Sequence, residues 1–188
     1  MKKIILAAAV ALMSFAANAQ EGKFAYVSFE EIVMLMPEMD EARAILEENT
    51  KTNEEILMSM YQEYQNKVQQ YEQKSSTWTA AIVEAKQREI MDIEQRIQQT
   101  QQSLQQEIQQ LQQKLQAPIV EKANKAIAEL AKSKGVAAVV EKSVFLYVDP
   151  EQMIDLTPEA RVVLNIPEGR TMETLQAELM AKAQAAQR

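Results

Sequence analysis

A stretch of 80 residues, 38–117, contains neither glycine nor proline, although the whole chain has three glycines and five prolines. Both residue types interrupt helices, so their absence favours continuous helix. A single helix of this length would be about 120 Å long. The poorest helix-forming cluster near its middle is Ser75-Ser76-Thr77-Trp78-Thr79. The sequence therefore predicts an antiparallel helical hairpin that turns at 75–79.

Apolar residues recur along both predicted helices at steps of three and four, the pattern of a narrow coiled-coil seam. Folding at the turn sets Tyr64 opposite Ile90 and Leu57 opposite Ile97. Such a seam buries one partner helix and no globular core. The predicted hairpin seam consists of Leu57, Tyr61, Tyr64, Val68, Tyr71, Ile90, Ile93, Ile97, Leu104, Ile108, Leu111 and Leu115.

Glutamine dominates the second helix away from the seam, with thirteen glutamines between Gln87 and Gln116. Glutamine is a good helix former without charge, so we interpret this as a solvated coiled-coil face. A prion-like aggregation segment is the alternative that composition offers. The regular Ile/Leu stripe argues against it.

The first 19 residues have the features of a secretory signal peptide. Lys2 and Lys3 precede an apolar run over 4–16, and Ala17-Asn18-Ala19 matches a cleavage site. The run is too short to span a bilayer. We expect a soluble periplasmic protein beginning at Gln20, with no stable membrane insertion. Removing two lysines takes the formal charge from −7 to −9, which gives no general attraction for nucleic acid.

Short elements are expected on both sides of the hairpin. Residues 24–27 read as a buried strand, and Ser28-Phe29-Glu30-Glu31 as a capping box before a short helix. Pro37 either separates this helix from the hairpin or lies in the first turn of the next helix. Pro118 predicts a kink in the second long helix, or else a division into two consecutive helices.

The C-terminal part is predicted to add strands and two helices. Residues 136–140 and 144–148 read as a β-hairpin, although Glu141-Lys142-Ser143 lacks the Asn or Gly of a tight turn. Thr157 is expected to cap a helix, and 171–186 to form a last one. The fold class is thus mainly α with a small β body (α+β). The domains are 1–19 signal peptide, 20–37 with 135–188 body, and 38–134 arm.

Several kinds of chemistry are excluded by composition. The chain has no histidine and no cysteine, so it lacks the usual general base, the thiol nucleophile and most metal ligands. Three scattered glycines make no phosphate-binding loop. We expect no enzyme activity, no cofactor and no metal site.

The order of these parts resembles the Skp (OmpH-like) periplasmic chaperone family. The similarity rests on Phe24-Ala25-Tyr26-Val27, the helix ending at Pro37, the long hairpin, Phe145-Leu146-Tyr147-Val148-Asp149-Pro150 and Asp155-Leu156-Thr157. The resemblance implies a homotrimer whose strands build one β body. It also implies that the arms enclose unfolded outer-membrane proteins and that this binding uses no ATP. This chain differs from the family in its net charge, because it is acidic whereas familiar members are strongly basic.

The candidate client contacts are adaptable apolar side chains beside the seam. Met58, Met60 and Met91 flank it, and methionine suits promiscuous binding surfaces. Each could equally be seam packing or an isolated surface residue. Trp78 could anchor a client at the tip or simply close the end of the hairpin. The alternative function is a structural coiled-coil spacer or adaptor in the cell envelope.

Overall fold

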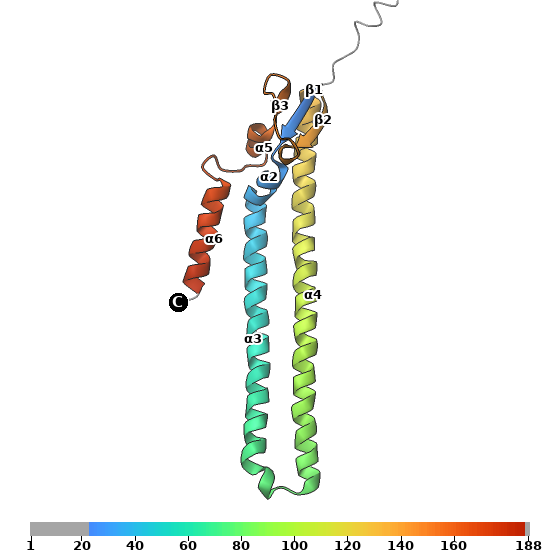
Figure 1. Cartoon of the computed structure of the whole chain (residues 1–188), viewed down its shortest axis with the longest axis vertical. Helices are drawn as coiled ribbons and strands as arrows, with labels where there is room; N and C mark the ends of the chain where they lie inside the picture. Colours follow the sequence, from blue (N-terminus) through green and yellow to red (C-terminus); the bar gives the residue numbers. More distant parts are fainter. Residues whose placement is uncertain (1–22, 187–188) are drawn as a thin grey trace, which may run out of the picture. The chain divides into compact units, whose positions relative to one another are not determined.

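The computed structural model describes residues 23–186, so the predicted signal peptide lies outside the described part. The chain divides into two compact units. Among the described residues, one unit combines 23–36 with 122–186, and the other is Pro37–Glu121. Long helices dominate, and a three-stranded sheet is the β component, so the predicted mainly helical fold class is confirmed (Figure 1).

The helical hairpin turns where the sequence predicted. Helix α3 (Pro37–Lys74) ends in a short 3-10 helix, η1 (Ser75–Thr77), and α4 (Ala80–Ser133) begins three residues later. In the turn, the Thr77 hydroxyl donates to the Lys74 carbonyl at 2.7 Å. The Trp78 ring meets the Tyr71 ring edge to face, with centroids 6.1 Å apart. Local hydrogen bonds and one aromatic contact therefore replace helix at the serine–threonine cluster.

The two prolines beside the hairpin lie within helices. Pro37 is the first residue of α3, where its missing N–H costs no hydrogen bond. Pro118 lies inside α4, which continues to Ser133, so a division into two helices is wrong. The kink at Pro118 stays a prediction. Gly135, at φ 65°, follows the helix in the left-handed conformation that favours glycine.

Contacts between α3 and α4 are sparse and partly polar. Ile93 and Ile97 are buried at 1% and 4% exposure, whereas Tyr61 is 42% exposed. Asn53 is also buried, and its side-chain amide donates to Asn49 of the same helix at 3.1 Å. The remaining predicted seam residues, Leu57, Tyr64, Val68, Tyr71, Ile90, Leu104, Ile108, Leu111 and Leu115, are half-buried. The hairpin thus has a dry segment at Ile93 and Ile97 and further buried side chains near its open end, namely Met39, Ala42 and Ile119. The rest of the contact between the helices is largely wet.

Hydrogen bonds across the hairpin fix which residues face each other. Tyr71 accepts from Gln87 at 2.6 Å, and Tyr61 accepts from Gln101 at 2.8 Å. Tyr64 lines a hollow with Ile97 and not with its predicted partner Ile90. The hydrogen-bonded pairs also differ from the predicted alignment, by about one turn at Tyr71 and about two turns at Tyr61. Residues 75–79 make a loop longer than a minimal turn, and equal spacing of the apolar residues on both helices permits either register.

Lys67 of α3 forms a salt bridge with Glu89 of α4 at 2.9 Å, and Lys86 approaches the same carboxyl at 2.7 Å. Hydrogen bonds from Lys86 and Lys67 lower the pKa of Glu89. This ion-pair cluster is partly exposed, so its contribution to stability is small.

The sheet is entirely parallel. Strand β1 (Lys23–Val27) lies between β2 (Val136–Glu141) and β3 (Met153–Asp155) and pairs with both. Ala25 and Val27 are buried, whereas Phe24 is half exposed. The predicted β-hairpin of 136–140 with 144–148 is wrong. Lys142–Val144 form a 3-10 helix, η2, because Glu141-Lys142-Ser143 lacks the residues of a tight turn.

Three shorter helices accompany the sheet. They are α2 (Phe29–Leu35), α5 (Thr157–Val163) and α6 (Met172–Ala186), and α2 contacts both others. Fully buried Ile32, Leu35 and Leu156 supply part of their core. The predicted capping box of α2 is wrong. The Glu141 carboxylate accepts from the Phe29 N–H at 2.7 Å instead.

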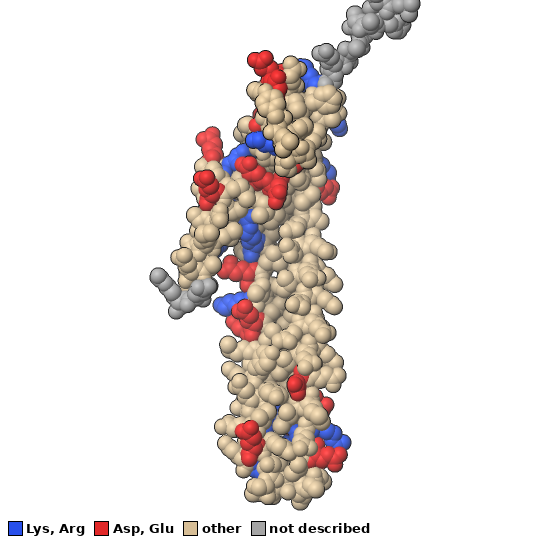
Figure 2. Space-filling model, viewed as in Figure 1, with Lys and Arg blue, Asp and Glu red and all other residues tan. Residues whose placement is uncertain are grey.

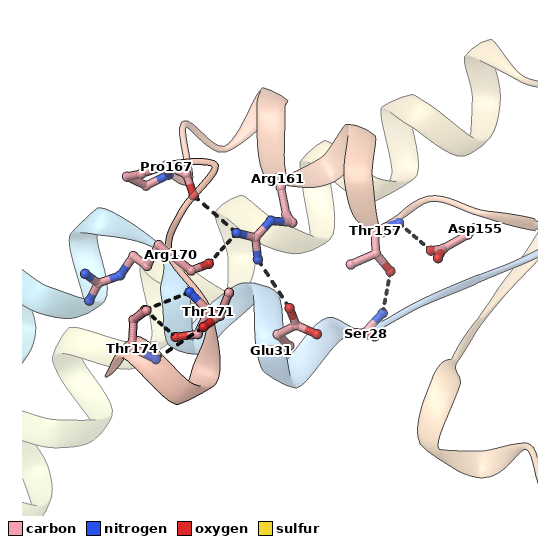
Figure 3. Close-up of polar contacts among 9 residues, drawn as sticks. All are labelled: Ser28, Glu31, Asp155, Thr157, Arg161, Pro167, Arg170, Thr171 and Thr174. Carbon is pink, nitrogen blue, oxygen red and sulfur yellow. Dashed lines mark hydrogen bonds and ion pairs between the residues drawn. The ribbon is translucent and has the colours of Figure 1, made fainter. Parts of the chain in front are cut away.

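Polar contacts join these helices across long sequence separations (Figure 3). The Thr157 hydroxyl accepts from the Ser28 N–H at 3.0 Å and does not cap its own helix, which corrects the predicted role. Arg161 forms an ion pair with Glu31 at 3.2 Å. The same guanidinium donates to the carbonyls of Pro167 and Arg170, and so fixes the connection from α5 to α6.

The dry segment of the hairpin should account for much of its stability. Replacing Ile93 by alanine should cost about 2–4 kcal/mol, because the cavity forms at a fully buried side chain. Met91→Ala is the control, since Met91 is 57% exposed and should change stability by no more than about 0.5 kcal/mol. Urea unfolding followed by circular dichroism measures both. Equal midpoints for the two variants would contradict this packing.

Candidate binding surfaces

Among residues 23–186, no group of His, Cys, Asp and Glu side chains is arranged to hold a metal ion. A separate search of the same residues finds no helix long and apolar enough to cross a membrane. The candidate functional features are therefore surfaces: two hollows, several exposed apolar side chains and an uncharged stretch of α4.

A hollow of about 840 Å³ lies beside the sheet. Tyr26, Glu141, Lys142 and the segment 145–148 belong to its lining. The Lys142 ammonium lies 6.0 Å from the centre of the Tyr26 ring. Burial, followed by the nearby Asp155 carboxylate, raises the pKa of the Tyr26 phenol, so this hydroxyl stays protonated at neutral pH.

One wall of this hollow carries apolar side chains that nothing in the described chain covers. Leu146 is 108% exposed and Tyr147 79%, and Val144, which precedes the lining segment in the chain, is 66% exposed. Such contiguous exposed apolar residues are typical of interaction sites. Sequence reasoning missed this surface because it assigned 144–148 to a strand paired with 136–140. The missing turn residues after Glu141 were the available signal.

A second hollow, of about 290 Å³, lies between the helices of the hairpin. Its lining combines the apolar Ile97 with Tyr61 and Tyr64, with the amides of Gln98 and Gln101, and with the carboxylate of Glu94. Three predicted seam residues thus meet here. They form an open pit and not a closed core, since Tyr61 remains 42% exposed.

The predicted client contacts lie in different surroundings. Met58 and Met91 are exposed at 63% and 57%, and Met60 is half-buried. None of these methionines lines either hollow described above. Trp78 is half-buried against Tyr71, an arrangement that suits closing the end of the hairpin.

Charge is unevenly distributed along the hairpin. Between Arg96 and Lys114 of α4 the only charged residue is Glu107. Figure 2 shows α4 largely free of charged side chains along its middle, whereas charged groups gather near the turn. The middle of α4 therefore presents a polar but nearly neutral surface.

Comparison with known proteins places the chain in a family. A family model described as outer membrane protein (OmpH-like) matches residues 23–161. A solved structure from Caulobacter crescentus CB15, described as a candidate outer membrane chaperone (OmpH-like), shares the fold with a TM-score of 0.69. The two are 14% identical, and the similarity covers 77% of this chain and 84% of that one. A search of curated proteins gave no match.

The family match includes the sheet, the whole hairpin and α5 up to Arg161, and leaves α6 outside. It covers well over half of the chain and agrees with the resemblance seen in the sequence. This chain belongs to the OmpH-like outer membrane protein family.

Proposed function

We propose that the protein is an ATP-independent periplasmic holdase chaperone. It binds unfolded outer-membrane proteins between its helical arms and prevents their aggregation before outer-membrane assembly. The family match over residues 23–161 carries this proposal, because it includes the hairpin and the sheet together. The related fold from Caulobacter crescentus CB15, described as a candidate outer membrane chaperone, supports it. No catalytic step, cofactor or metal is needed for this role.

The properties of the hairpin support weak, many-point binding. Exposed apolar side chains such as Met58 and Met91 alternate with polar ones, so no single patch fits one folded partner. Methionine adapts its shape to different partners. Each contact contributes little, and a client is held without being fixed in one conformation.

The proposed chaperone is a homotrimer. Its body, 20–37 with 135–188, holds the subunits together, and the arms, 38–134, remain outside the subunit interface. In the described chain β2 and β3 are the outer strands of a three-stranded sheet, and open edges invite pairing with another chain. The exposed side chains of Val144, Leu146 and Tyr147, which follow β2 in the chain, offer area that such an interface would bury. Residues 1–19 would direct the chain to the periplasm and be removed.

The general function is tested by dilution of a urea-unfolded outer-membrane barrel into buffer without nucleotide. The mature protein should suppress light scattering by several unrelated unfolded barrels, because its contacts are degenerate. A coiled-coil spacer would leave aggregation unchanged. Failure to suppress aggregation of any of them would overturn the proposed function.

Subunit assembly should depend on the exposed segment. Leu146→Asp should shift the trimer to monomers at micromolar concentration, since the change puts a charge where an apolar interface is proposed. Met58→Asp is the control, because Met58 is also exposed but lies on the arm. Sedimentation equilibrium measures both. A wild-type monomer, or a trimer unaffected by Leu146→Asp, would contradict the proposed interface.

The methionines beside the seam should act collectively. Replacing Met58, Met60 and Met91 together by glutamine should weaken client affinity about fivefold, whereas single replacements stay within about twofold. The control is Met180→Gln, because Met180 is 55% exposed and lies on α6, outside the arms. Fluorescence titration with an unfolded barrel measures the affinities. Equal affinities for the triple variant and the wild type would remove these residues from the client surface.

A further inference from the structure

The second long helix carries a continuous band of amide side chains that the proposed function does not yet use. Ten glutamines lie within residues 98–113, and all ten are exposed. We call them the glutamine face. Its members are Gln98, Gln99, Gln101, Gln102, Gln105, Gln106, Gln109, Gln110, Gln112 and Gln113. They occupy the α4 positions outside the seam, so the band surrounds the solvent side of the helix.

The amide groups of this face are available for binding. Gln101 donates to the Tyr61 hydroxyl at 2.8 Å. Within residues 23–186, the structure gives the other nine side chains no hydrogen bond or ion pair. Each glutamine amide offers two N–H donors and one carbonyl acceptor. The backbone groups of α4 are already bonded within the helix, so these side chains are the free hydrogen-bonding groups of the surface.

The glutamine face is continuous with the hollow between the helices. Gln98 and Gln101 belong both to the face and to the lining of the hollow of about 290 Å³. Ile97 and Tyr64 give that hollow its apolar part. The carboxylate of Glu94 also belongs to the lining, beside the amides. The apolar part of this pit can take one apolar side chain while the neighbouring chain lies on the glutamines.

Charge decides which kind of partner suits this surface. The stretch 97–113 contains no Lys or Arg and one carboxylate, Glu107. It therefore lacks the cations that nucleic acid or an anionic lipid surface would require. This stretch also repels neither positive nor negative groups strongly, although the whole chain has a formal net charge of −7. A neutral surface of free amides matches a neutral polymer of amides, which is an unfolded polypeptide backbone.

We propose that the glutamine face recognises the unpaired backbone N–H and C=O groups of an extended polypeptide, with one apolar side chain seated in the adjoining pit. This inference rests on the proposed holdase function and identifies which surface of the arm carries it. A folded protein has few unpaired backbone groups and is a poor ligand. The surface thus distinguishes unfolded from folded chains by hydrogen-bonding groups that every sequence possesses.

The test removes amides without weakening the helix. The face variant replaces Gln102, Gln105, Gln109 and Gln113 by alanine, the best helix former. The matched control replaces Gln62, Gln65, Gln69 and Gln73 of α3, which are exposed and have the same spacing. Circular dichroism should give both variants the helicity of the wild type. Neither set includes a residue of the pit.

Affinity for a urea-unfolded outer-membrane barrel is then measured by fluorescence titration of the full mature protein. The face variant should bind about tenfold more weakly, because several amide hydrogen bonds are lost, and the control should stay within about twofold. Equal affinities of the two variants would overturn the inference. If the wild type itself fails to prevent aggregation, the proposed function fails instead, so the two failures are distinguishable.

A second measurement tests the backbone groups directly. The probe is a synthetic peptide of alternating apolar and polar residues, compared with the same peptide N-methylated at alternate backbone nitrogens. The wild type should bind the N-methylated peptide more weakly, because methylation removes N–H donors, and the face variant should lose this preference. Equal binding of both peptides by the wild type would contradict recognition of the backbone.

Discussion

Parallel pairing of β1 with two strands from the far end of the sequence is the interaction on which the fold depends. The Ala25 position pairs with Val139 on one side and with Ile154 on the other. Parallel strands cannot be joined by a tight turn and need a long connection between them. Here the connection from β1 to β2 contains α2, α3 and α4. The sheet therefore closes a loop that holds the entire hairpin, and the Leu156 N–H extends it by donating to the Tyr26 carbonyl at 3.0 Å.

The same sheet pairing supplies the hydrogen-bond partners at the start of α2. The first N–H of α2 is satisfied by Glu141 at the end of β2, and the Ser28 N–H by Thr157 of α5. Both bonds exist only when the strands are paired, since their partners are more than 100 residues apart in the chain. Loss of the sheet would leave these donors without partners, which is costly in a partly buried site. Sheet pairing and helix capping thus support each other.

The hairpin, by contrast, is held by few buried groups. Ile93 and Ile97 form a dry segment, while Asn53 places a polar amide among the buried side chains. Outside the dry segment, α3 and α4 interact through tyrosine–glutamine hydrogen bonds and a partly exposed ion-pair cluster. A seam of this kind leaves much of each helix free to meet other molecules. For a holdase that is an advantage, because the exposed surface of the arm, and not its interior, receives the client.

Much of this architecture follows from local chemistry in the sequence. The absence of Gly and Pro over 38–117 and the cluster at 75–79 determined two long helices and their turn, because helix propensity and helix breaking act between near neighbours. The positions of β1 and α6 also followed from local sequence, namely the apolar run 24–27 and the Ala-rich run 171–186. The OmpH-like family was also recognisable from the sequence, because the order of the helices and strands along the chain could be predicted.

Tertiary structure alone decided which distant groups meet. Residues 136–140 are a strand as expected, but they pair in parallel with β1, since the partner of a strand depends on the whole fold and not on its own residues. Glu141 caps α2 in place of the local capping box for the same reason. The alignment that pairs Tyr61 with Gln101 is also a tertiary property, because apolar stripes of equal spacing fit together in more than one alignment.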